Sequence, residues 1–446
     1  MRDTALPHDC NARGVMMTTM NGALPVRAFF REIRAIPGTV SGRVVILVAL
    51  CYFLNMIDRN VVSVAAPEIQ REFGLTNTQL GLAFSVFGFP YLLQAPVGWL
   101  CDKWGSRLGL TIFGSIWSLA TIFCGLSSSL AGLVGARALL GLGEAAPFPA
   151  MTRVIADWTP PTRRSFMQGL THSFVSIGTT VTPPLVAWLM GYVGWRGAFL
   201  MLGGISVVWV VVWAWRFRDD PRTHPGVTKE ELAQLVFTRK AKAKAPWRRL
   251  IPAMLPPTLV YLCLSATFWT FWTWLPTYFA RSYHLELKSS AIFTFGVLFA
   301  GVFGDISGGW LSDYLYRRTG SLRIARNALI GTSLILAAVC IGPVLFIREV
   351  NLAALALATG FFFIRAAVSP TWAVCTDIAP GWAGSAGGML NTGSAVSSIC
   401  APLAFGFIAD LTGNYSTPFS ASLCLLLVGA AMCLVMRPDR QVQDVA

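Results

Sequence analysis

Two long apolar stretches of this chain each contain a pair of ionisable residues. Asp58 and Arg59 are adjacent within residues 44–66, and Arg137 and Glu144 lie within residues 130–156. A charge at the centre of a bilayer costs roughly 2.5–3.5 kcal/mol on insertion scales, so such residues usually face a bundle interior or a water-filled path. These four residues are the first candidates for chemistry, because a buried acid can carry a proton and an arginine can bind an anion.

The spacing within each pair predicts where its side chains point. Arg137 and Glu144 are seven residues apart, which on a helix is about 700° of rotation and ~10.5 Å of rise. They are therefore predicted to face the same way at different depths. Asp58 and Arg59 point ~100° apart, so one can pair with a neighbour while the other contacts a ligand.

Membrane-spanning helices are the elements that must position these residues. The chain has 446 residues, of which 54% are hydrophobic and 13% charged, whereas a soluble chain is about 25% charged. Apolar runs of about 18 residues or more indicate transmembrane helices. We predict an all-α membrane protein with twelve of them, near residues 43–66, 78–101, 107–128, 130–157, 165–191, 196–216, 255–280, 289–313, 325–347, 351–378, 384–410 and 415–436.

The basic residues predict the orientation of the chain. The net charge is +14, and Lys and Arg are concentrated before the first span, in alternate loops, in the middle segment and after the last span. Cytoplasmic loops carry such an excess, so both termini and the middle segment are predicted to be cytoplasmic. The domains are then a tail (1–42), a six-helix half (43–216), a cytoplasmic linker (217–254) with a short helix from Thr228 to Lys240, a second six-helix half (255–436) and a tail (437–446).

The same placement argues against nucleic-acid binding, because the charge follows membrane topology. Metal and cofactor sites are not expected either, since there is no C-x-x-C and the four histidines have no ligand spacing. A G-x-G-x-x-A stretch, Gly141 to Ala146, lies inside an apolar span, where small residues indicate close helix contact and not a dinucleotide site. A membrane acyltransferase would need a reactive motif such as H-x4-D, which is absent.

A motif repeats between the two halves. The stretch Gly98-Trp-Leu-Cys-Asp102-Lys103-Trp-Gly105-Ser-Arg107 has a counterpart in Gly309-Trp-Leu-Ser-Asp313-Tyr-Leu-Tyr-Arg317-Arg318, and the first glycines are 211 residues apart. Glycine permits close helix approach, and the aspartate ends each helix on the cytoplasmic side. We therefore expect a gating or structural role for Gly98, Asp102, Lys103, Gly105, Arg107 and Asp313.

With this motif the chain resembles the major facilitator superfamily, whose loop signature is G-x-x-x-D-K-x-G-x-R and whose architecture is two repeated halves. From about residue 43 to 436 it is similar to the anion:cation symporters of that superfamily. The matching stretches are Asn55-Met-Ile-Asp58-Arg59, Arg137-x6-Glu144-Ala-x-x-Phe-Pro, Trp158-x5-Arg164, Gly194-Trp-Arg196, Phe271-Trp-Thr-Trp274-Leu-Pro276-x-Tyr278, Thr371-Trp372 and Asn391. The second copy of the motif lacks the second glycine, and Met56 replaces the family's usual Tyr or Phe.

The resemblance implies a proton-coupled symporter, acting as a monomer in a bacterial cytoplasmic membrane. It would import an organic anion such as a sugar acid, a dicarboxylate or an aromatic carboxylate. Proton coupling is expected at Asp58 and Glu144. Substrate binding is expected at Arg59, Arg137, Tyr91, Trp372 and Asn391. Ser369 and Tyr261 are candidates to replace the polar group that is lost where Met56 stands. An exporter of the same fold and a nutrient sensor without transport remain alternatives.

Two further charges depart from the family's usual pattern. Asp305 and Arg365 lie in the eighth and tenth predicted spans, ~12 Å and ~18 Å from the cytoplasmic ends of those spans. One hypothesis is a salt bridge between them, and another is that Arg365 is a second cation for the substrate. His172, in the fifth span, is equally compatible with packing and with a substrate or proton role.

Overall fold

The structure is a computed structural model that describes residues 33, 34, 36–75, 77–235 and 245–442. Throughout these residues the regular elements are helices, so the all-α prediction is confirmed for them. The N-terminal half contains α3 (Val40–Phe73), α4 (Asn77–Ser85), α5 (Gly88–Tyr91), α6 (Gln94–Trp104), α7 (Ser106–Leu126), α8 (Leu130–Gly143), α9 (Pro147–Trp158) and α10 (Arg164–Arg216). The C-terminal half contains α12 (Trp247–Ser282), α13 (Leu287–Thr319), α14 (Leu329–Ile341), α15 (Val350–Ile378), α16 (Ala383–Thr412) and α17 (Phe419–Met432).

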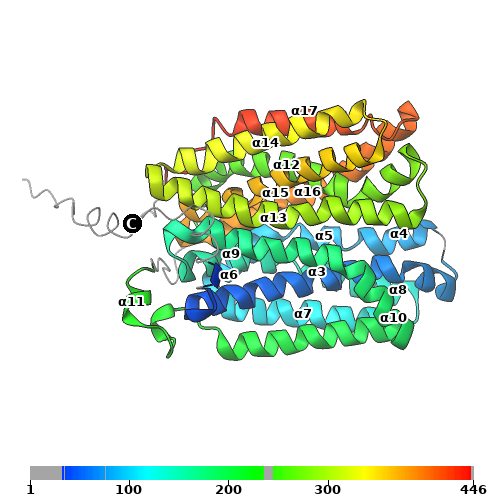
Figure 1. The fold of residues 1–446 in the computed structure, drawn as a ribbon. Helices are drawn as coiled ribbons and strands as arrows, with labels where there is room; N and C mark the ends of the chain where they lie inside the picture. Colours follow the sequence, from blue (N-terminus) through cyan, green and yellow to red (C-terminus); the bar gives the residue numbers. More distant parts are fainter. Residues whose placement is uncertain (1–32, 35, 76, 236–244, 443–446) are drawn as a thin grey trace, which may run out of the picture.

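The two halves lie against each other along their length (Figure 1). Helices α3 to α10 form the lower bundle in this view and α12 to α17 the upper one. The linker between them contains the short helix α11 (Lys229–Leu232), capped by the Thr228 hydroxyl. The predicted helix from Thr228 to Lys240 is wrong for residues 233–235, which are not helical, and its residues 236–240 lie outside the described residues. Contacts between α10 and α13 and between α6 and α16 join the two bundles.

Eight helices in the described part of the chain are long and apolar enough to cross a membrane, or nine if the bent pair Gly81–Tyr91 and Gln94–Trp104 counts as one. Two of the predicted spans share α10, on either side of Gly194, whose φ of 67° interrupts the helical backbone. The last predicted span corresponds to α17, which has only 14 residues. The count of twelve spans and the cytoplasmic termini therefore remain predictions.

Two spans predicted as continuous helices are broken, so that part of the prediction was wrong. The stretch 130–157 is divided at Glu144–Ala146, between α8 and α9. Pro147 begins α9 and Pro149 follows, and proline has no N–H to continue the hydrogen bonding of a preceding helix. The stretch 78–101 is divided at residues 86–87 and 92–93, around Gly88 and Pro90. Arg137 lies in α8 and Glu144 is its C-terminal cap, with its N–H bonded to the Leu140 carbonyl (2.9 Å), so the break follows this pair.

Both copies of the repeated motif lie between the halves at one end of the molecule. We call this end, marked by Asp102 and Asp313, the closed end. Asp102 on α6 accepts hydrogen bonds from the backbone N–H of Gly384 (2.9 Å) and Ser385 (2.7 Å), where α16 begins. Asp313 on α13 accepts one from the Phe166 N–H (2.7 Å), where α10 begins. Each motif aspartate thus caps a helix of the opposite half.

The rest of the motif supports this end. Gly98 faces the Gly384 backbone of the opposite half. Gly105 has a φ of 95°, which favours glycine, where the chain turns from α6 into α7. Arg107 donates to the Ala214 carbonyl (2.8 Å), and Lys103 lies over the Trp99 ring.

Close packing of α13 on α15 depends on small residues. A Cβ on Gly308 would overlap the backbone of Ala366 on α15, whereas Gly296 on α13 has no atom near the corresponding position. Gly308→Ala is therefore expected to destabilise the protein by about 1–3 kcal/mol through overpacking. Gly296→Ala is the matched control and should leave stability unchanged. Thermal unfolding in detergent checks both, and equal stability of the two variants would contradict this close contact.

Candidate substrate site

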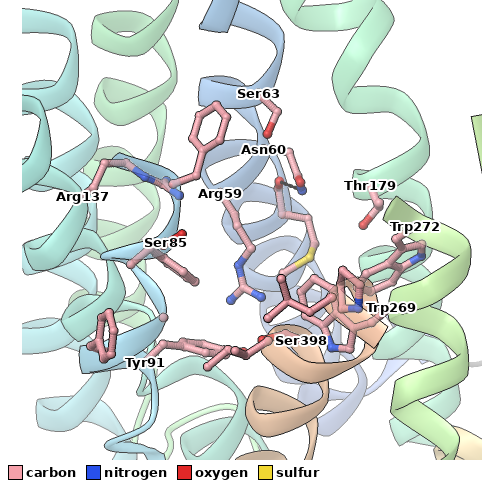
Figure 2. Close-up of a pocket in the computed structure, with 18 residues that line it drawn as sticks. Arg59, Asn60, Ser63, Ser85, Tyr91, Arg137, Thr179, Trp269, Trp272 and Ser398 are labelled. Carbon is pink, nitrogen blue, oxygen red and sulfur yellow. Dashed lines mark hydrogen bonds between the residues drawn. The ribbon is translucent and has the colours of Figure 1, made fainter. Parts of the chain in front are cut away.

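A cavity of about 430 Å³ lies between the two halves, towards the end opposite the closed end. Helices α3, α4, α5, α8 and α10 line it from one half, and α12 and α16 from the other (Figure 2). Its walls are largely aromatic and aliphatic, with Trp269 and Trp272 from α12. The polar lining residues are Arg59, Asn60, Ser63, Ser85, Tyr91, Arg137, Thr179 and Ser398.

Arg59 points into this cavity and is paired with a buried acid (Figure 2). Its Nε lies 2.6 Å from Oε2 of Glu144, whose side chain is fully buried. The guanidinium also lies over the Tyr91 ring, 4.6 Å from the centroid, and donates weakly to Asn55 (3.4 Å). Glu144 caps the C-terminus of α8, where its N–H bonds to the Leu140 carbonyl (2.9 Å). An anion that contacts Arg59 would compete with this carboxylate.

Arg137 also lines the cavity, but no carboxylate in the described residues is within salt-bridge distance of it. Its Nε donates to the Ala83 carbonyl (3.3 Å), and its guanidinium lies 5.0 Å from the Phe87 centroid. Its Nη1 is buried without a hydrogen-bond partner. A buried guanidinium with a spare donor is suited to an anionic ligand.

Asp58 points away from the cavity, although it is next to Arg59. It is 1% exposed and accepts hydrogen bonds from the Trp117 indole (3.0 Å) and the Ser206 hydroxyl (2.6 Å). Neither Asp58 nor Glu144 lines the cavity surface. The side chains of Asp58 and Arg59 therefore lie in different environments. Asp58 is buried among helices of its own half, whereas Arg59 pairs with Glu144 and faces the cavity.

Asp305 and Arg365 form the ion pair that was one of the two hypotheses for them. Arg365 Nη2 and Nε lie 2.8 Å and 3.1 Å from Asp305 Oδ2. The pair also contacts α10 of the opposite half, because Ser176 donates to the same carboxylate oxygen (2.8 Å) and Arg365 Nη2 reaches the His172 carbonyl (3.4 Å). The hydroxyl of Ser369 donates to the Asp305 backbone carbonyl (2.8 Å).

A smaller cavity of about 20 Å³ is lined by predicted substrate-binding residues from both halves. Arg59, Tyr91, Tyr261, Arg365 and Asn391 all line it. The Asn391 amide donates to Gln94 (2.5 Å) and to the Tyr91 hydroxyl (3.3 Å), which links α16 to the N-terminal half.

Of three further residues considered for the site, only His172 lines the small cavity. Ser369 and Trp372 line neither cavity, although Trp372 packs on the Tyr261 ring at 5.6 Å. The Nδ1 of His172 is 2.9 Å from the Gln168 carbonyl and therefore carries the proton, which leaves an acceptor Nε2 without a partner. No group of His, Cys, Asp and Glu in the described residues could hold a metal ion.

Sequence reasoning missed several buried polar groups between the helices. Arg326, counted only as a topology signal, is fully buried between Asp313 (3.1 Å) and Asp377 (2.9 Å). Arg153 pairs with Asp157 (2.8 Å), and it also donates to the carbonyls of Pro380 and Gly381 across the halves. The i,i+4 spacing of an Arg and an Asp in an apolar stretch was the available signal for the last pair.

Comparison with known proteins places the chain in a family. The model of the Major Facilitator Superfamily matches residues 48–399. A probable sulfoacetate transporter of Cupriavidus necator is 41% identical over 398 residues, which is 88% of this chain and 93% of that protein. A probable galactarate/D-glucarate transporter of Escherichia coli is 30% identical over 402 residues, 84% of this chain and 88% of that one.

Solved structures have the same fold. The major facilitator transporter FucP in its outward conformation superposes with a TM-score of 0.69 at 16% identity, over 88% of this chain and 98% of that one. The human organic anion transporter MFSD10 gives 0.68 at 15% identity, over 88% and 99%. The chain belongs to the major facilitator superfamily, and the relatives it matches are transporters and not enzymes.

Proposed function

We propose that this protein is a proton-coupled symporter that imports a small organic anion by alternating access. The observation that supports this most directly is the Arg59–Glu144 pair, in which the arginine faces the cavity between the halves and the acid is buried behind it. A substrate anion that binds Arg59 weakens the hold of the arginine on Glu144, which favours protonation of that carboxyl. Substrate and proton would then bind together.

The net charge moved across the membrane in each transport cycle favours coupling to more than one proton. Each net charge moved down the membrane potential is worth ~2.3 kcal/mol per 100 mV, so a monoanion uses the potential only if at least two protons accompany it. A dianion with two protons is imported electroneutrally, driven by the pH gradient alone, and needs a third proton to use the potential. Asp58 and Glu144 are the proposed proton carriers, and Arg59, Arg137, Tyr91 and Asn391 the proposed substrate contacts. Sulfoacetate is the first substrate to test, because the 41% identical relative is named a probable sulfoacetate transporter.

The proposed setting is the bacterial cytoplasmic membrane, with one chain as the working unit. Under the positive-inside orientation, the closed end faces the cytoplasm, and the large cavity faces the opposite side. The proposed domain boundaries are those given by the charge pattern: tails at 1–42 and 437–446, six-helix halves at 43–216 and 255–436, and the linker at 217–254.

Uptake into proteoliposomes tests the proposal. The protein is reconstituted, an inward proton gradient is imposed, and labelled sulfoacetate, D-galactonate and D-glucarate are supplied outside while a dye reports internal pH. We expect at least one of these anions to accumulate and to acidify the lumen beyond the passive leak. Accumulation without added acidification would contradict coupling. In vesicles preloaded with the labelled anion, its release driven by the same gradient would indicate an exporter.

Arg59→Ala is expected to abolish stabilisation by the substrate. A ligand at a hundred times its Kd stabilises a protein by about 2.7 kcal/mol, which wild type should show as a raised Tm in a thermal-shift assay with sulfoacetate. The control is Arg196→Ala, which removes a half-buried arginine that pairs with Glu72 away from the cavity. A full ligand-induced shift in Arg59→Ala would remove Arg59 from the substrate site.

A further inference from the structure

We propose that Arg365 is a specificity-determining residue, which makes this carrier select short dianions held by Arg59 in one half and Arg365 in the other. The inference rests on the proposed function and adds the charge of the substrate to it. Arg59 and Arg365 both line the same small cavity, on α3 and α15 respectively. A ligand with an anionic group at each end would therefore bridge the two halves.

The charge of the cavity surface supports a dianion. The charged residues that line the two central cavities, among those described, are Arg59, Arg137 and Arg365. The acids of this region, Asp58, Glu144 and Asp305, lie behind that surface. A ligand that enters meets cations only, so a second negative charge gains a contact where a neutral polar group would not.

Arg365 retains a donor for a ligand. Its Nε and Nη2 are used by Asp305 and by the His172 carbonyl, while Nη1 donates to no described protein atom. All three hydrogen bonds to the Asp305 carboxylate fall on Oδ2, and Oδ1 is buried without a partner. Asp305 thus holds Arg365 from one side and leaves the other edge of its guanidinium unused.

Stability alone does not account for this pair. A buried ion pair is often no more stable than a well-packed apolar pair of similar volume, and charges in membrane spans usually serve a pathway. The pair lies at the depth of the ligand cavities and touches α10 of the opposite half through Ser176. The small cavity that Arg59 and Arg365 both line is about 20 Å³, room for about one water molecule, so a bridging ligand must widen it and a short spacer between the two anionic groups requires the least widening.

The test compares isosteric ligands that differ by one charge. Sulfoacetate is a dianion, and sulfoacetamide has the same shape with one charge fewer. Affinities are measured by calorimetry on the purified protein and by competition in counterflow. Wild type is expected to bind sulfoacetate at least about tenfold more tightly than sulfoacetamide, which corresponds to about 1.4 kcal/mol.

The double variant Asp305→Asn with Arg365→Gln removes both charges, so that no unpaired buried charge remains. It is expected to lose the dianion preference and to keep the wild-type affinity for sulfoacetamide. Arg365→Lys keeps the charge balance but loses the forked donors, so the preference should fall in this variant as well. The matched control, Arg153→Gln with Asp157→Asn, removes an equally buried pair that lines neither cavity, and the preference should persist.

The outcomes separate the two proposals. If the double variant or Arg365→Lys keeps the full wild-type preference, Arg365 is a structural residue and the inference is overturned. If wild type prefers sulfoacetamide or binds both equally, the dianion class is wrong while anion transport stands. If wild type binds neither of these nor any other organic anion supplied, the proposed function itself fails.

Discussion

Glu144→Gln is expected to lower proton-driven accumulation of the substrate about tenfold per pH unit of gradient, while exchange of substrate across the membrane continues. Glutamine keeps the size and the hydrogen bond to Arg59 but cannot take up a proton. One pH unit of gradient is worth about 1.36 kcal/mol per coupled proton, so each lost proton lowers the limiting accumulation about tenfold per pH unit. Substrate exchange needs no net proton movement and should therefore survive.

Two assays on the same proteoliposomes separate these effects. Net uptake under an imposed proton gradient measures coupling. Counterflow with substrate on both sides measures only substrate binding and the alternating-access conformational change. The matched control is Glu72→Gln, which neutralises an acid that pairs with Arg196 but has a side chain 46% exposed. An exposed pair contributes little to stability, so this control should transport as wild type does. Accumulation by Glu144→Gln at the wild-type level would assign the coupled proton to another group.

The sequence alone identifies those residues whose burial in a membrane span has a high free-energy cost. Asp58, Arg59, Arg137, Glu144, Asp305 and Arg365 are ionisable side chains within apolar runs, and such groups need partners or a polar path. That rule led to the Asp305–Arg365 ion pair as one of two hypotheses, and the structure contains this pair. The repeated motif likewise marked one end of both halves without any knowledge of the contacts made there.

The sequence could not supply the partners of these groups. The hydrogen bonds of Asp58 come from Trp117 and Ser206, which are 59 and 148 residues away along the chain. No periodic pattern encodes such a contact, because it depends on how α3, α7 and α10 pack. The break that follows Glu144 was also missed, since the apolar run continues through Glu144 and Pro147. Glu144 itself still continues α8, because its N–H bonds to the Leu140 carbonyl (2.9 Å), so its contact with Arg59 depends on how α3 and α8 pack.

Asp102→Asn combined with Asp313→Asn is expected to open the closed end. Each aspartate caps a helix of the opposite half: Asp102 binds the backbone N–H groups of Gly384 and Ser385, and Asp313 binds that of Phe166. Asparagine keeps a capping oxygen and loses only the charge, which at a helix N-terminus is worth about 0.3–1 kcal/mol. Loss of both charges should therefore shift the equilibrium between closed and open forms of this end by about threefold to thirtyfold.

Cys375 reports this opening, because it lies near the closed end and is fully buried. In a background with all other cysteines replaced by serine, its alkylation by a small maleimide should be slow in the parent and faster in the double variant. The control is Glu349→Gln. Glu349 caps α15 by accepting from the N–H groups of Asn351 (2.9 Å) and Leu352 (2.7 Å), bonds that lower the pKa of its carboxyl, but it does so within one half.

Loss of the Glu349 cap should cost similar stability and leave the Cys375 rate unchanged. The comparison thus separates helix capping as such from capping across the halves. An unchanged rate in the double aspartate variant would mean that other cross-half contacts, such as those of Arg153 with the Pro380 and Gly381 carbonyls, are sufficient to hold this end closed.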